Sequence, residues 1–208
     1  MTSKHVLLWV YGVYAVVITA LLIIPKTDLP NFYSPFFMAG VSTAALLIIL
    51  IPGFFARHAS VYRRAVVRRY QAVLALCIAV NGLGGLGLYK LYKVGIQYDK
   101  ILHFLVSSIL VLIAAHFLFH WRSYSATRAV ILALVIVIAG GILWEVWEVL
   151  QDAVFHTQTA GVYGADYFND TMFDLIFDVI GSVCGGILLY VDRTRRRIPG
   201  LPFSLNKF

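Results

Sequence analysis

The chain is poor in charged residues and in cysteine. Asp, Glu, Lys and Arg make up 13% of its 208 residues, whereas hydrophobic residues make up 61%. A soluble domain carries about 25% charged residues, so a soluble enzyme is excluded. The 2 cysteines, Cys77 and Cys184, both fall in apolar segments, which argues against a disulfide framework. Neither a phosphate-binding loop nor a serine–histidine–acid arrangement is apparent.

What the chain has in abundance is apolar sequence. Stretches of about 20 apolar residues, long enough to cross a bilayer as a helix, recur along it. They lie at roughly 5–24, 36–55, 70–89, 101–120, 129–149 and 171–191. We therefore expect an all-α, polytopic membrane helix bundle with about six transmembrane helices, forming one integral membrane domain over residues 1–208. The first stretch is expected to remain as a helix, because it is longer than a signal-peptide core.

Positive charge marks one side of this bundle. The basic residues crowd the second loop and the tail after the last stretch: Arg57, Arg63, Arg64, Arg68, Arg69, Arg193, Arg195, Arg196 and Arg197. Because cytoplasmic loops carry an excess of Lys and Arg, both termini are predicted to be cytoplasmic, in a bacterial or archaeal plasma membrane. Basic loops beside a membrane attract anionic lipid, so the net charge of +7 requires no nucleic-acid partner.

Negative charge is expected on the opposite side. Most of the 10 Asp and Glu residues fall in or beside the extracytoplasmic ends of the last three stretches. They form helical stripes: Asp99 with His103, Glu145 with Glu148 and Asp152, and Asp170 with Asp174 and Asp178. Small residues continue these stripes inward and allow close helix packing: Gly140, Gly141, Gly181 and Gly185. The three stripes are therefore expected to converge at one depth.

Carboxylates that converge in an apolar environment need protons or a cation to neutralise them. Carboxylate oxygens suit Mg²⁺, Mn²⁺ or Ca²⁺, and a histidine ligand admits Zn²⁺. The expected metal ligands share one depth: His103, Glu145, Glu148, Asp174 and Asp178. Glu148 is also expected to take part in catalysis, with Asp99 orienting His103 and Lys100 meeting an anionic headgroup. No lysine or arginine is expected to be buried among the acids.

Two further acids, Asp152 and Asp170, are expected at the periphery of the site. Near helix ends, pairing with lysines explains them as well as a functional role does, and Asp170 suits a helix N-terminus. The loop over residues 150–170 is aromatic and contains no Lys or Arg. It is expected either to cover the pocket or to form an ordinary interfacial aromatic belt.

The segment Asp99-Lys100-x-x-His103, at the start of a helix, resembles the corresponding motif of VanZ-like membrane proteins. That family continues with a Glu, matched here by Glu145, and with an Asp-bearing last helix that leads to glycines. The segment Asp170-Thr171-x-x-Asp174 is similar to the YjdF family of small bacterial inner-membrane proteins. The resemblance covers roughly residues 98–190. The VanZ-like pattern usually has amides where this chain has Glu148 and Asp178, so no role in antibiotic resistance is carried over.

Three functions fit these features. The first is a metal-dependent hydrolase or transferase acting on a lipid-linked substrate at the outer leaflet. The second is a proton- or cation-coupled carrier, although the polar stripe of the last helix stops at Gly185, which favours a one-sided site. The third is a non-catalytic lipid-binding protein whose acids hold the bundle together. The sequence also leaves open whether the chain forms a homo-oligomer.

Overall fold

A computed structural model describes residues 2–25, 28, 34–58, 60–155 and 167–194. In this part of the chain, 6 helices are long and apolar enough to cross a membrane, which confirms the predicted all-α polytopic bundle. The chain falls into two compact units, Met1–Ile96 and Gln97–Phe208. The single membrane domain expected from the sequence therefore stays a prediction.

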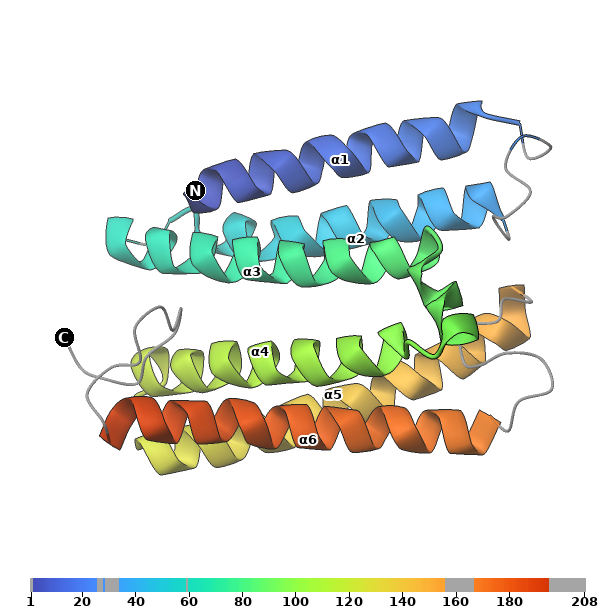
Figure 1. The fold of residues 1–208 in the computed structure, drawn as a ribbon. Coiled ribbons are helices and arrows are strands. Elements are labelled where there is room, and N and C mark those ends of the chain that lie inside the picture. The colour runs from blue at the N-terminus through green and yellow to red at the C-terminus, as the bar shows by residue number, and fades with distance from the viewer. Residues whose placement is uncertain (1, 26–27, 29–33, 59, 156–166, 195–208) are drawn as a thin grey trace. The chain divides into compact units, whose positions relative to one another are not determined.

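The first unit contains α1 (Ser3–Ile23), α2 (Pro35–Ala56), α3 (Val61–Gly85) and the short 3-10 helix η2 (Leu88–Val94). The three long helices lie side by side in Figure 1. Their shared core consists of apolar side chains from all three: Leu7, Val10, Tyr14, Ile49, Ala72 and Ala75. The Tyr14 hydroxyl donates a hydrogen bond to the carbonyl of Ile78 at 2.9 Å, which joins α1 to α3.

The basic residues of the predicted second loop lie mainly on a helix. α3 begins at Val61, well before the expected start at residue 70, so its first turns carry most of these arginines. The Ser60 hydroxyl caps α3 by accepting a hydrogen bond from the Arg63 amide at 3.3 Å. Hydropathy misses this start because it detects only the apolar part of a helix. The other end also differs, since Gly87 adopts a φ of 133° just after the helix ends at Gly85.

A buried glutamine of α3 bonds to the backbone of α2 one turn before Pro52. Pro52 lies inside α2 and has no backbone N–H to continue the hydrogen-bond ladder. Gln71 Nε2 donates to the carbonyl of Ile49 at 2.9 Å. Gly53 leaves room for this side chain, because a Cβ there would stand 2.7 Å from Gln71 Nε2.

We expect Gln71→Leu to destabilise the protein by about 1 kcal/mol, because it removes a buried hydrogen bond between α3 and α2. Thermal unfolding of the detergent-purified protein measures the effect. Leu76→Ala, at a position 47% exposed on the same helix, is the control and should change the melting temperature much less. Equal losses in the two variants would contradict this account of Gln71.

The second unit contains α4 (Tyr98–Trp121), α5 (Ala126–Phe155) and α6 (Tyr167–Thr194). α4 and α6 run in the same direction and α5 runs in the opposite one, so the start of α4, the end of α5 and the start of α6 share one end (Figure 1). α5 extends past the expected end at residue 149, and α6 starts earlier than residue 171. Asp170 therefore lies in the first turn of α6.

α4 and α6 approach each other at their backbones. A Cβ on Gly181 would collide with the carbonyl oxygen of Phe104, and one on Gly185 would lie 2.5 Å from the carbonyl oxygen of Ser108. The Ser108 hydroxyl donates to the carbonyl of Gly181 at 2.8 Å. These contacts confirm the close approach expected from the two glycines. Gly140 differs, because a Cβ at that position would have nothing within 4 Å.

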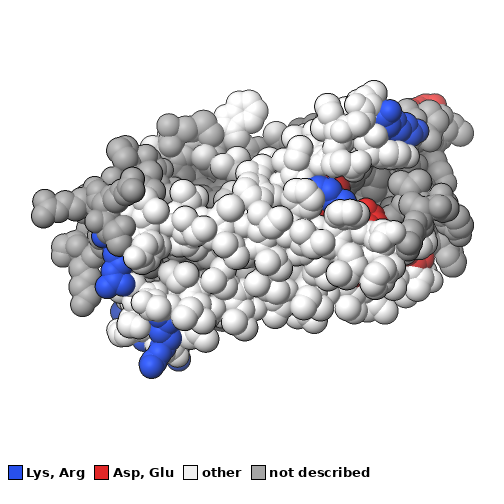
Figure 2. Space-filling view, turned by 60° about the horizontal axis from the view of Figure 1, so that its bottom comes forward, with Lys and Arg blue, Asp and Glu red and all other residues white. Residues whose placement is uncertain are grey.

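Most of the described side chains on the face shown in Figure 2 are uncharged. Many large apolar side chains of the spanning helices are exposed, for example Leu143 at 68% and Phe168 at 70%. A helical surface with so many exposed apolar side chains is suited to contact with the hydrocarbon core of a bilayer. The chain is therefore a multi-pass membrane protein.

Candidate functional site

Charged side chains from three helices meet at one end of the second unit. We call this group the acidic cluster: Asp99, Lys100 and His103 from α4, Glu145 from α5, and Asp170, Asp174 and Asp178 from α6. The parallel direction of α4 and α6 brings their stripes into register. Four members are almost fully buried, at 8%, 4%, 3% and 4% exposed: Lys100, Glu145, Asp174 and Asp178. The stripes predicted from the sequence therefore converge, with Glu145 as the member from α5.

Lys100 lies inside the acidic cluster. Its Nζ donates hydrogen bonds to Asp170 Oδ1 at 2.5 Å and to Asp174 Oδ2 at 2.7 Å. The same Nζ lies 3.5 Å from Asp99 Oδ2. The expectation that no basic residue is buried among the acids is therefore wrong. The three carboxylates compensate the ammonium for its lost hydration. The spacing of residues along α4 does not show this arrangement, because two of the three carboxylates belong to α6.

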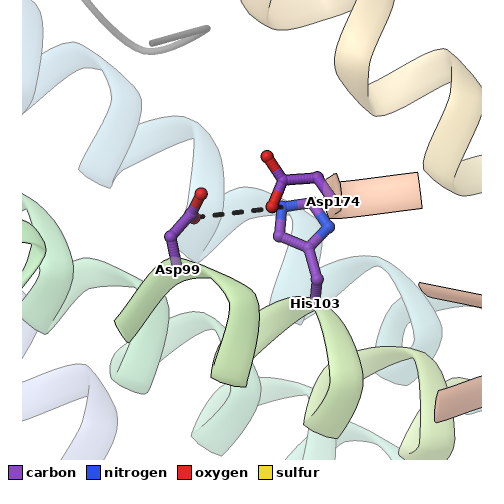
Figure 3. A group of neighbouring side chains, drawn as sticks. All are labelled: Asp99, His103 and Asp174. Atoms are coloured by element: carbon purple, nitrogen blue, oxygen red, sulfur yellow. Dashed lines mark ion pairs between the residues drawn. The ribbon is translucent and has the colours of Figure 1, made fainter. Parts of the chain in front are cut away.

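The imidazole of His103 lies between carboxylates from all three helices. Figure 3 shows two of them, Asp99 of α4 and Asp174 of α6. On one side, Nδ1 is 3.2 Å from Asp178 Oδ1. On the other side, Nε2 is 3.6 Å from Asp174 Oδ1 and 3.9 Å from both Asp99 Oδ1 and Glu145 Oε1. The three distances from Nε2 exceed normal hydrogen-bond lengths. Three carboxylate oxygens thus surround this nitrogen at ion-pair distance, and none of them forms a hydrogen bond with it.

Several of these oxygens are buried without a hydrogen-bond partner. Among the described residues, they include Glu145 Oε1, Asp174 Oδ1 and Asp178 Oδ2. A buried acceptor that is left unpaired costs about 1–3 kcal/mol, and more when it is charged. Two of the three, on Glu145 and Asp174, are the same oxygens that face His103 Nε2. The arrangement therefore suits a bound cation or proton at this point.

The geometry is compatible with a divalent cation. Asp99, His103 and Asp174 each offer one ligand atom, and these atoms all lie within 4.8 Å of one another. Two ligands on one ion, each bound at roughly 2.0–2.2 Å, stand roughly 3–3.5 Å apart. The three residues could hold an ion after small side-chain movements. A histidine that binds a metal through one ring nitrogen normally donates a hydrogen bond from the other to a carboxylate or a carbonyl. Asp178 lies in that position here, beside Nδ1.

Asp99 and Asp178 each lie beside the imidazole nitrogen at which the other was expected. Asp99, expected to orient His103, faces Nε2 on the side of Asp174. Asp178, expected as a metal ligand, instead lies on Nδ1. Helical spacing places a residue on a face, but the rotamer decides which imidazole nitrogen it meets. Their roles as ligand and orienting residue stay predictions.

The sequence reasoning missed Ser107. Its hydroxyl donates a hydrogen bond to Asp178 Oδ1, and the residue is 4% exposed. Gly141 of α5 gives the same carboxylate room, because a Cβ there would collide with Asp178 Oδ2. The available signal was the spacing, since Ser107 follows His103 by one helical turn on the same stripe of α4.

The other predicted residues lie at or beyond the edge of the cluster. Glu148 accepts a hydrogen bond from Trp144 Nε1 at 2.9 Å and is not among the three residues whose ligand atoms come together. Its catalytic and ligand roles stay predictions. Asp170, whose side chain is 34% exposed, lies at the rim, and Asp152 lies in the last turns of α5. The proposed lid falls largely on residues 156–166, outside the described residues.

Comparison with known proteins places the chain in a family. Residues 6–195 match the model of the family described as predicted membrane protein (DUF2238), and the chain belongs to that family. It is also 26% identical over 162 residues to an uncharacterized protein of Thermotoga maritima, covering 75% of this chain and 80% of that protein. No solved structure matches. The narrower likeness to VanZ-like and YjdF proteins stays a resemblance.

Proposed function

We propose that this member of the DUF2238 family binds a divalent cation between Asp99, His103 and Asp174, with Glu145 close by. The observation that carries the proposal is that two buried oxygens, one on Glu145 and one on Asp174, have no hydrogen-bond partner and face His103 Nε2 at 3.9 and 3.6 Å. An acidic cluster alone would be weak support, because carboxylates often pair with lysines. Here the ammonium of the cluster, on Lys100, is already engaged by other oxygens.

Charge balance also favours a cation. The cluster holds five carboxylates and one lysine, so a neutral or protonated His103 leaves an excess of negative charge in a poorly hydrated place. A divalent ion offsets two of these charges at once. A carboxylate and imidazole ligand set suits Mn²⁺ or Zn²⁺, and with more carboxylates also Mg²⁺ or Ca²⁺.

The chemistry that such a site supports best is hydrolysis or group transfer. A bound divalent ion polarises a phosphoryl or carbonyl oxygen and lowers the pKa of a bound water. In this chain Asp178 would hold the imidazole in place, Lys100 would keep Asp174 oriented, and Glu148 would serve as a base near the rim. The site would face the extracytoplasmic leaflet, because Arg122, Arg128 and Arg193 sit toward the opposite helix ends.

The proposal predicts that purified protein binds Mn²⁺ at about one ion per chain and that Asp174→Asn weakens binding about 100-fold, because an amide is a poor ligand. Calorimetry and elemental analysis measure both quantities. Asp192→Asn is the matched control, since Asp192 lies on the same helix and is 1% exposed, but far from the cluster. Equal affinities in the two variants, or no bound metal in the wild type, would refute the proposal.

A cation-coupled carrier remains the second candidate function. The observation in its favour is that buried polar residues continue on α6 below Asp178, at Ser182 and again at Asp192. Liposome flux distinguishes the two functions. A carrier transports Mn²⁺ or protons across the bilayer, and Asp178→Asn abolishes that flux, whereas a one-sided enzyme shows no flux above that of empty liposomes.

A further inference from the structure

A groove lies between α5 and α6, next to the acidic cluster. It has a volume of ≈ 240 Å³, and its walls are formed by Val146, Val149 and Leu150 of α5, Thr171 of α6, and Glu145. The three aliphatic side chains are 52%, 53% and 51% exposed, so the groove opens outward. Both helices belong to the membrane-spanning set. An apolar groove open to the bilayer is in contact with hydrocarbon chains and not with water.

Glu145 belongs to both the groove and the cluster. It lines the groove and is 4% exposed, while its Oε1 lies 3.9 Å from His103 Nε2 on the other side. On α6, Thr171 directly follows Asp170, whose partly exposed carboxylate bonds to Lys100. The groove and the exposed rim of the cluster therefore meet at the same end of the second unit.

We infer that the substrate of this site is a phosphate-bearing membrane lipid that enters sideways from the bilayer. One hydrocarbon chain lies in the groove beside Val146, Val149 and Leu150, and the polar end reaches the cluster. The inference rests on the proposed function for the chemistry at the polar end.

The two neighbouring surfaces select this class of molecule together. A soluble phosphate ester has no chain to place against the aliphatic wall, whereas a lipid has both parts. Carboxylates alone repel a phosphate, but a divalent ion on Asp99, His103 and Asp174 accepts phosphate oxygens as further ligands. A single molecule that fits both surfaces needs an apolar chain and an anionic headgroup.

Photolabelling tests the inference. The full chain is reconstituted with Mn²⁺ in vesicles of phosphatidylethanolamine and phosphatidylglycerol that contain phosphatidylglycerol with a diazirine in one acyl chain. We expect crosslinks to concentrate on the groove walls. Val149→Phe fills the groove and should lower this labelling about tenfold, which corresponds to losing the burial of about two methylene groups. Val135→Phe, at a position 60% exposed elsewhere on α5, should leave it unchanged.

Labelling of the groove no stronger than that of the exposed face at Val135 and Ile136 would overturn the inference. Labelling that persists in Val149→Phe would overturn it as well. Bound manganese, measured on the same samples, separates this inference from the metal site. Val149→Phe should keep its manganese, whereas a labelled wild type without manganese would support the lipid groove and overturn the proposed function.

Discussion

Lys100→Met is expected to destabilise the protein by about 3–5 kcal/mol, the loss typical of removing one partner from a buried ion pair. The substitution keeps the length of the side chain but removes the ammonium between Asp170 and Asp174. Asp174 is 3% exposed and cannot recover its hydration from solvent. The lysine also joins α4 to α6 at the site. Its replacement therefore removes both a positive charge and a contact that holds the two helices together. Thermal unfolding in detergent measures the effect.

Lys93→Met is the control for this experiment, because Lys93 is an exposed lysine of η2. It should change the melting temperature little. If a divalent ion binds the same carboxylates, Mn²⁺ should restore part of the stability of Lys100→Met, since a ligand that binds the folded state stabilises it. A Lys100→Met protein as stable as Lys93→Met would mean that the buried ion pairs do not hold α4 against α6.

Gly181→Ala is expected to destabilise the protein by about 3 kcal/mol, near the upper end for overpacking in a tight core. The new methyl group would collide with the carbonyl oxygen of Phe104, which is backbone and cannot rotate away. α4 and α6 would have to separate, which would also stretch the contacts of Lys100 and His103 with α6. Metal binding should therefore weaken together with thermal stability.

Gly140→Ala provides the comparison for this prediction. Gly140 lies in a membrane-spanning helix like Gly181, but nothing lies within 4 Å of the added methyl group. Alanine also favours a helix more than glycine does, by about 1 kcal/mol, so this variant should be unchanged or slightly stabilised. If both alanine variants melted at the same temperature, the close approach of α4 and α6 would not be needed for stability.

The sequence predicted which residues form the site better than it predicted the contacts between them. The stripes through His103, Glu145 and Asp174 converge as expected, because burial in a membrane bundle forces polar faces to meet. The direction of each side chain could not be predicted in the same way. Lys100 could have extended to the membrane surface, and only the contact with α6 shows that it turns inward.

The helix boundaries show a similar limit. Hydropathy predicts a start of α3 near residue 70, because the arginines before it lower the local value, yet Ser60 caps the helix well before that point. Hydropathy reports which residues suit hydrocarbon, whereas capping and helix propensity decide where a helix starts. Ser107 was missed for another reason, since its one signal was the spacing of one helical turn from His103, and a serine in an apolar helix more often bonds to its own backbone.

The most direct test of the account is to locate the ion. Anomalous diffraction from crystals of the full chain grown with Mn²⁺ would show its position. The account predicts a peak about 2.2 Å from His103 Nε2 and from an oxygen of Asp174, absent in Asp174→Asn crystals. Strong manganese peaks elsewhere with none beside His103, or a peak there that survives in Asp174→Asn, would contradict it.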